Sequence, residues 1–165
     1  MFVLGIDPGL SVTGYAVVDG GDPMRAVSAG VIRTDPSAPV AERLAELFAD
    51  IADVIAEHEP SEAAIEEVFV NLNRQTATGV GRASGVAILA AARAGLKVAE
   101  YTPSAVKLAV AGYGDADKAQ VQAMVARRLG IAHAPSPADA ADACAVAICH
   151  IQSAGIRRAV EAAGR

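Results

Sequence analysis

The sequence predicts an α/β domain built on a mixed five-stranded sheet with helices on both faces. Three segments with strand character open the chain and are joined by short turns, as in an antiparallel meander. After residue 40 the apolar spacing changes to three and four, and helices then alternate with single short strands. Such alternation forms parallel strand pairs covered by helices, so both patterns together predict a mixed sheet.

The meander is the first part of the predicted sheet. Its turns are Asp7-Pro8-Gly9 and Gly20-Gly21-Asp22-Pro23, combinations that favour a tight change of chain direction. The predicted strands are residues 2–6, 13–19 and 25–34.

Helices and strands then follow in turn. An amphipathic helix with an acidic outer face is predicted over residues 40–57, and a strand over residues 63–70. After a polar loop at residues 71–78, an alanine-rich helix ends before Gly95. The later elements are a strand Lys97–Tyr101, helices Pro103–Ala111 and Lys118–Leu129, and a helix from Ser136-Pro137 to about residue 153. We expect one domain over residues 1–155 and a poorly ordered C-terminal tail over residues 156–165.

Charge is distributed unevenly along the 165 residues. The net charge of -5 argues against a nucleic-acid partner, because such proteins usually carry a basic surface. Residues 1–67 hold 13 acids and 3 arginines, a net -10, whereas residues 68–165 hold 11 bases and 6 acids, a net +5. The second half can therefore offer a polyanion-binding face, although solvated surface charge would produce the same asymmetry.

The protein is predicted to be cytoplasmic. The N-terminus lacks a basic segment ahead of its apolar run, so it does not resemble a signal peptide. No apolar run approaches the roughly 20 residues that span a bilayer, so we expect no membrane association. Cys144 and Cys149 lie five apart on a predicted helix and point to different sides, which prevents a bridge between them.

Acidic residues occupy positions where a covered layer is expected. Asp7 ends an apolar strand, where an unpaired carboxylate is costly, although an Asp-Pro-Gly turn is an alternative explanation. Glu66 and Glu67 point to opposite faces of one strand, and periodicity does not choose between them. Asp139 and Asp142 share a helical stripe with core-type residues, although Asp139 also suits the first turn of a helix.

Carboxylates that converge repel one another unless divalent cations neutralise them. Oxygen ligands without a Cys or His pair favour Mg²⁺ or Mn²⁺ over Zn²⁺. Two such ions suit phosphodiester hydrolysis, because one activates water and the other stabilises the leaving oxygen. The residues therefore predict a carboxylate-metal nuclease.

Four segments closely resemble, in order and spacing, the RuvC family of bacterial Holliday junction resolvases. They are GIDPGLSVTGYAVV, AIEEVF, YTPSAVKLAVAGYGDADKAQVQAMV and DAADACAVAICH. The resemblance implies an RNase H-like fold and a homodimer that places paired, symmetric, metal-dependent nicks in strands of like polarity of a four-way DNA junction. It also implies a role in recombination and repair, thymine-rich cut sites, and coupling to the RuvA and RuvB branch-migration proteins.

The resemblance also assigns roles to individual residues. It implies two Mg²⁺ per subunit, with Mn²⁺ able to substitute, and it selects Glu66 rather than Glu67 as a ligand. The implied metal-binding acids are Asp7, Glu66, Asp139 and Asp142. Lys107 and Lys118 would lie near the scissile phosphate, although helix-surface charge explains them equally well, and Phe69 would contact bases at the crossover. Arginines considered for holding the junction arms are Arg74, Arg82, Arg127 and Arg128.

The alanine-rich helix is a candidate dimer interface, because small residues permit close approach; burial against its own sheet is the alternative. The residues concerned are Ala83, Gly85, Ala87, Ala90 and Ala91. His133 and His150 are expected to be incidental to catalysis.

Three other functions compete with junction resolution. A nucleotide-binding module of the actin-like ATPase superfamily shares the opening motif, but the chain is short for that class and lacks a second Asp-Gly phosphate loop. An RNA-processing nuclease with an RNase H-like fold would lack the ADKAQVQAMV segment. A catalytically silent junction-binding protein is the third alternative.

Overall fold

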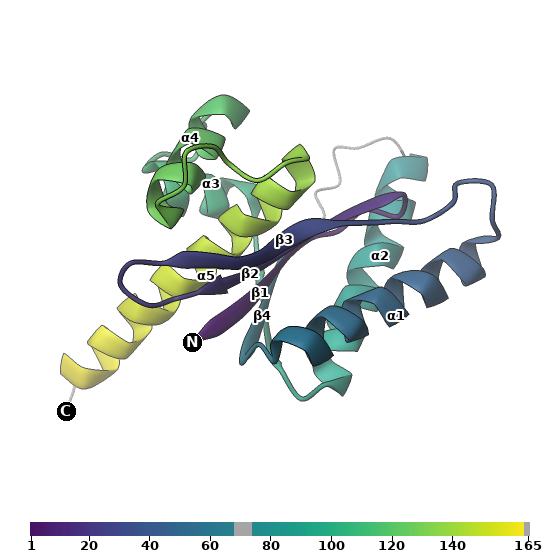
Figure 1. Cartoon of the computed structure of the whole chain (residues 1–165), viewed down its shortest axis with the longest axis horizontal. Coiled ribbons are helices and arrows are strands. Elements are labelled where there is room, and N and C mark those ends of the chain that lie inside the picture. Colours follow the sequence, from purple (N-terminus) through teal and green to yellow (C-terminus); the bar gives the residue numbers. More distant parts are fainter. Residues whose placement is uncertain (68–73, 164–165) are drawn as a thin grey trace.

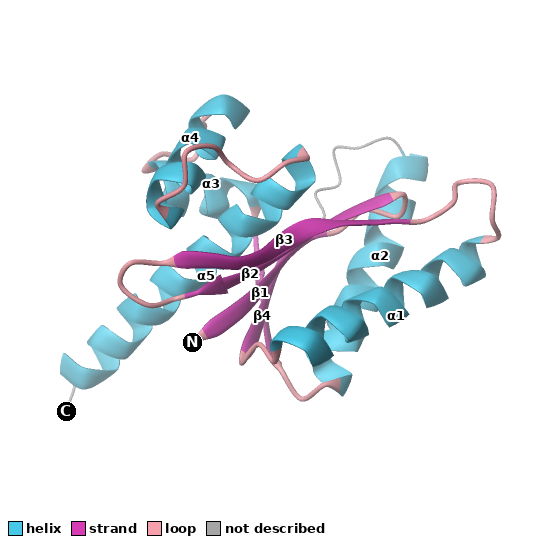
Figure 2. Cartoon of the chain, viewed as in Figure 1, coloured by secondary structure: helices cyan, strands magenta, loops and turns pink. Residues whose placement is uncertain are grey.

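The computed structural model describes residues 1–67 and 74–163, with side chains described for residues 1–67 and 76–155. Its single sheet has the strand order β3-β2-β1-β4-β5. The first four strands of this order are labelled in Figure 2. β1, β2 and β3 pair antiparallel, whereas β4 and β5 run parallel to β1. The strands are β1 Phe2–Asp7, β2 Val12–Asp19, β3 Arg25–Arg33, β4 Glu62–Glu66 and β5 Lys97–Tyr101. The predicted mixed sheet is confirmed.

Helices cover both faces of this sheet (Figure 1). α1 and α2 pack together on one face, and α5 crosses the other face with α3 and α4 beside it. The helices are α1 Val40–His58, α2 Arg74–Arg93, α3 Pro103–Ala111, α4 Lys118–Leu129 and α5 Ala138–Ala163. None of the described helices is both long and apolar enough to cross a membrane.

The alternation of side chains along β1 determines on which face of the sheet the Asp7 carboxylate lies. Leu4 and Ile6 belong to the core between the sheet and α1 and α2, whereas Val3 belongs to the core beneath α5. Asp7 lies an even number of residues from Val3 and therefore shares its face. On β4, Ala64 also packs in the α5 layer, so Glu66 points to the same side.

Two glycines let α5 lie directly on the strand backbones. A Cβ atom at Gly5 would overlap the carbonyl oxygen of Ala143, and one at Gly14 would overlap the carbonyl oxygen of Asp139. Gly14 is the antiparallel partner of Asp7. The start of α5 therefore lies over β2, next to the end of β1.

Several element boundaries differ from the prediction. α2 begins at Arg74 inside the predicted polar loop, because Arg and Gln are good helix formers despite their polarity. β4 ends at Glu66, in register with Tyr101, the last residue of its neighbour β5. The next residue, Thr102, caps α3, so β5 does not continue as a partner for β4. Residues 68–70, predicted to continue β4, lie outside the described residues.

The last helix does not end near residue 153 as expected. α5 continues to Ala163, through most of the segment predicted to be a poorly ordered tail. The added residues are rich in alanine and contain no proline, so one glycine at position 155 does not stop the helix. Cys144 and Cys149 lie on this helix, both free and buried, as predicted.

Most alanines of α2 face the sheet and not an outer surface. Four of them are buried in the core against the protein's own sheet, as the alternative explanation held: Ala83, Ala87, Ala90 and Ala91. Gly85 points away from the core, and nothing lies within 4 Å of the position a Cβ atom would take there.

Candidate active site

Four carboxylates gather at the edge of the sheet where the parallel strands β1 and β4 end. Asp7 and Glu66 are the last residues of these two strands, and Asp139 and Asp142 lie in the first turns of α5. Ligands bind in this position in sheets with parallel strands. Asp7 hydrogen-bonds to Glu66, and the charges of Asp139 and Asp142 both act on Asp7.

Burial and the neighbouring negative charges raise the pKa of two of these groups. Burial, followed by the charges of Glu66 and Asp142, raises the pKa of Asp7 from 3.8 to about 8. Burial also raises the pKa of Glu66, while its hydrogen bond with Asp7 opposes that rise. The rise in the pKa of Asp7 indicates that the cluster lacks positive charge. This shortage, together with an all-oxygen donor set, fits a divalent cation.

The carboxylates are gathered but are not yet arranged as ligands. Among the described residues, no group of three or more His, Cys, Asp or Glu side chains stands ready to hold a metal ion. Asp142 instead forms an ion pair with Lys118, in which Nζ and Oδ2 lie 2.7 Å apart. Asp7 is hydrogen-bonded to Glu66. Both contacts involve rotatable side chains, so the carboxylates would be able to turn toward a bound cation while the elements that carry them stay in place.

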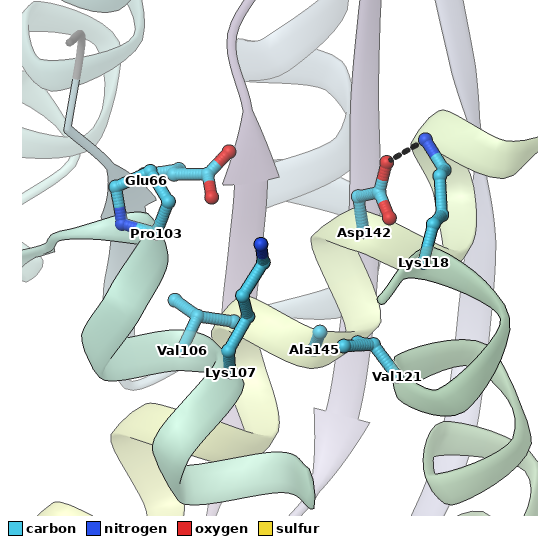
Figure 3. Close-up of a pocket in the computed structure, with 8 residues that line it drawn as sticks. All are labelled: Glu66, Pro103, Val106, Lys107, Lys118, Val121, Asp142 and Ala145. Atoms are coloured by element: carbon cyan, nitrogen blue, oxygen red, sulfur yellow. Dashed lines mark hydrogen bonds and ion pairs between the residues drawn. The ribbon is translucent and has the colours of Figure 1, made fainter. Parts of the chain in front are cut away.

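A cavity of about 240 Å³ adjoins the carboxylates (Figure 3). Glu66 and Asp142 face each other across it, and Lys107 from α3 extends between them. Lys118, the first residue of α4, stands beside Asp142 and is more than half exposed. Its hydrogen bond to Asp142 raises the pKa of Lys118. Both lysines selected from the sequence therefore lie with Glu66 and Asp142.

The metal-free cluster should respond to pH. Between pH 3.8 and about 8, folded Asp7 binds a proton that the unfolded chain releases, so the free energy of unfolding should fall as pH rises through this window. Asp7→Asn should remove most of this slope and stabilise the metal-free protein at pH 8 by on the order of 2 kcal/mol. Urea unfolding in EDTA at pH 5, 6.5 and 8 measures both effects. An unchanged slope in Asp7→Asn would contradict the assignment.

The other residues named from the sequence are either not described or lie apart from the carboxylates. Phe69 lies outside the described residues, and Arg74 begins α2 with a side chain that is not described. Glu67 follows the end of β4 and is exposed. Arg128 donates to the carbonyl oxygens of Ala109 and Val110 and thereby ties α4 to the end of α3.

The loop after Asp7 is held by side chains that the sequence patterns do not single out. Thr34 donates to the carbonyl oxygen of Leu10, 2.6 Å away. The buried Arg43 donates to Thr34 at 2.9 Å and to the hydroxyl of Ser11 at 2.8 Å. The detectable signal was the position of Arg43, which falls on the same stripe of α1 as its buried apolar residues.

The comparisons with known proteins agree with this geometry. The model of the family described as crossover junction endodeoxyribonuclease RuvC matches residues 3–150. This chain belongs to the RuvC family. The RuvC of Pelotomaculum thermopropionicum is 50% identical over 91% of this chain and 92% of its own length. That of Salinispora arenicola is 50% identical over 99% of this chain and 94% of its own length.

Solved structures of RuvC are also similar to the structure of this chain. The structure of Thermus thermophilus RuvC has a TM-score of 0.89 and 37% identity, and the match covers 94% of this chain and 96% of that one. The same protein in complex with a Holliday junction substrate gives a TM-score of 0.85 and 39% identity, covering 91% and 92%. These matches confirm the predicted RNase H-like fold. They also favour a RuvC over the actin-like nucleotide-binding module, since the likeness covers nearly the whole chain.

Proposed function

We propose that this RuvC-family chain resolves Holliday junctions by metal-dependent hydrolysis, placing paired nicks in DNA strands of like polarity during recombination and repair. The observation that carries the proposal is the gathering of four acids at one edge of the sheet: Asp7, Glu66, Asp139 and Asp142. A structural relative solved with a Holliday junction substrate supports the choice of DNA. Coupling to RuvA and RuvB, and a cytoplasmic location, belong to the same proposal.

The four carboxylates would hold two Mg²⁺ ions, with Mn²⁺ as a substitute. Bound there, the ions would supply Lewis-acid activation of water and of the phosphodiester. Lys118 pairs with Asp142 and, from that position, its ammonium group would lie beside the scissile phosphate. Lys107 reaches the same cavity and adds positive charge where the transition state gains negative charge.

The test of this function compares nucleic acids and metals. The protein is incubated with a synthetic four-way junction, duplex DNA and structured RNA, with Mg²⁺, with Mn²⁺, or with EDTA. Symmetric nicks confined to the junction and dependent on metal are expected. The absence of cleavage with either metal, or equal cleavage of RNA, would overturn the proposal.

Lys107→Ala should slow junction cleavage by about 10²-fold at saturating metal, because it removes a charge aimed at the reacting phosphate. Single-turnover cleavage measures the effect. Lys97→Ala is the matched control: Lys97 is exposed at the start of β5, at the opposite end of the strand from the site, and its loss should leave the rate unchanged. Equal rates for the two variants would remove Lys107 from catalysis.

We also propose that the protein acts as a homodimer. A junction of near two-fold symmetry calls for two active sites related by the same axis, which an isologous dimer supplies. With the alanines of α2 buried, the outward face of that helix carries Gly81, Gly85 and Leu89, spaced four residues apart. Leu89 is 52% exposed, large for an apolar residue without a partner.

Leu89→Glu should convert the dimer to a monomer, because it places a charge at the centre of the proposed apolar contact. Light scattering after size-exclusion chromatography measures the mass. Val27→Glu, at another exposed apolar position, on β3, should leave the dimer intact. A dimeric Leu89→Glu protein would place the interface elsewhere.

A further inference from the structure

A chain of polar groups crosses the core beneath α5, away from the carboxylates. His150 is 2% exposed, and its Nε2 lies 2.6 Å from Oε2 of Glu62. Its Nδ1 lies 2.9 Å from the phenol oxygen of Tyr101, and the two rings meet edge to face. With Nε2–H donating to the carboxylate and Nδ1 accepting from the phenol, both ring nitrogens are satisfied. A hydrogen-bonded network around a buried ring rigidifies a core and specifies its packing.

The network joins β4 and α5, which carry site residues, to β5, which leads into α3. Glu62 begins β4, the strand that ends at Glu66. Tyr101 ends β5 in register with Glu66, just before α3 with Lys107. His150 lies on α5, eight residues after Asp142.

Spacing along the two elements connects the network to the site. Four residues of strand separate Glu62 from Glu66 and rise about 13 Å. Eight residues of helix separate Asp142 from His150 and rise about 12 Å. A hydrogen bond between His150 and Glu62 at one end therefore brings Asp142 opposite Glu66 at the other, where both line one cavity.

The close contact of α5 with β1 specifies this register poorly. Alanine makes up most of the buried face of α5, beside Val146 and Ile148, and both Ala143 and Ala147 lie over Gly5. Sliding the helix by one turn would exchange one alanine for another at that contact, yet would shift Asp142 by about 5.4 Å. Directional hydrogen bonds distinguish the two registers where small side chains do not.

We propose that Glu62, His150 and Tyr101 form a positioning network that sets the register of α5 on β4, and so the separation of Asp142 and Glu66. The inference rests on the proposed metal site. None of the three residues touches that site, so all three act through the placement of other groups. We expect loss of the network to lower the affinity for the metal more strongly than it lowers the stability of the fold.

The test measures Mn²⁺ binding to the full chain directly, by calorimetry without DNA, alongside thermal unfolding. His150→Leu removes both hydrogen bonds and should weaken Mn²⁺ binding about tenfold, the loss typical of groups that support metal ligands. His150→Gln keeps an N–H donor for Glu62 and should recover most of the affinity. Ile148→Val, a buried change on the same helix, should lower the unfolding temperature without changing the affinity.

Tyr101→Phe covers the case in which His150→Leu fails to fold. It keeps the ring and removes a single hydrogen bond, and it should weaken Mn²⁺ binding about two- to threefold. If these variants lose thermal stability but bind Mn²⁺ as tightly as the unchanged protein, the positioning role is wrong. If the unchanged protein itself binds no Mn²⁺, the proposed metal site fails and this inference fails with it.

Discussion

Asp142→Asn is expected to abolish junction cleavage, lowering the single-turnover rate by about 10³-fold or more, while junction binding is preserved. The side chain keeps its size but loses the negative charge that faces Glu66 across the cavity and pairs with Lys118. Binding should survive because the change removes a negative charge from a surface that must accept phosphates. Mobility shift in EDTA measures binding, and cleavage is followed with Mg²⁺ and with Mn²⁺.

Glu67→Gln is the matched control for this loss. Glu67 lies one residue beyond β4 and is exposed, whereas Glu66 is partly buried in the α5 layer. Glu66→Gln should therefore lower the cleavage rate as strongly as Asp142→Asn does. Glu67→Gln should cleave at nearly the rate of the unchanged protein. Retained nuclease activity in Asp142→Asn would remove that residue from the metal site.

Gly14→Ala is expected to destabilise the protein by about 3 kcal/mol and to abolish cleavage as well. The added methyl group would overlap the carbonyl oxygen of Asp139, a backbone atom that moves only if the start of α5 moves. Because Gly14 pairs with Asp7, that movement separates Asp139 from Asp7. Urea unfolding and single-turnover cleavage measure the two losses.

Gly155→Ala makes the same chemical change where there is room for it. Gly155 lies within α5, and nothing is within 4 Å of the position its Cβ would take. A helical glycine replaced by alanine should raise stability by about 0.5 to 1 kcal/mol and leave cleavage unchanged. A Gly14→Ala protein with the stability and activity of the unchanged chain would show that α5 does not need this close approach.

Local signals in the sequence determined several elements to the residue. The bounds of β5, α3 and α4 agree with the prediction because their ends are encoded nearby. Thr102 caps α3 ahead of Pro103, and Asp117 forms a capping box with Gln120 at the start of α4. Gly112 ends α3 in a left-handed conformation.

Longer-range features were predicted less well. Periodicity left Glu66 and Glu67 equivalent, because it does not show where a strand loses its neighbour. The alanines of α2 suited a dimer contact and a sheet contact equally, since a small side chain permits either. His150 looked incidental because its partners, Glu62 and Tyr101, lie 88 and 49 residues away along the chain.

By itself, then, the sequence determined the order of strands and helices, the mixed sheet they imply, and a set of acids that resembles a RuvC site. Only the tertiary structure brought those acids together. The parallel pairing of β1 with β4 sets Asp7 beside Glu66, and α5 lies on Gly5 and Gly14. The physical reason is that each carboxylate reaches the cluster through contacts between residues distant in sequence. Local propensity specifies the elements, and their packing specifies the site.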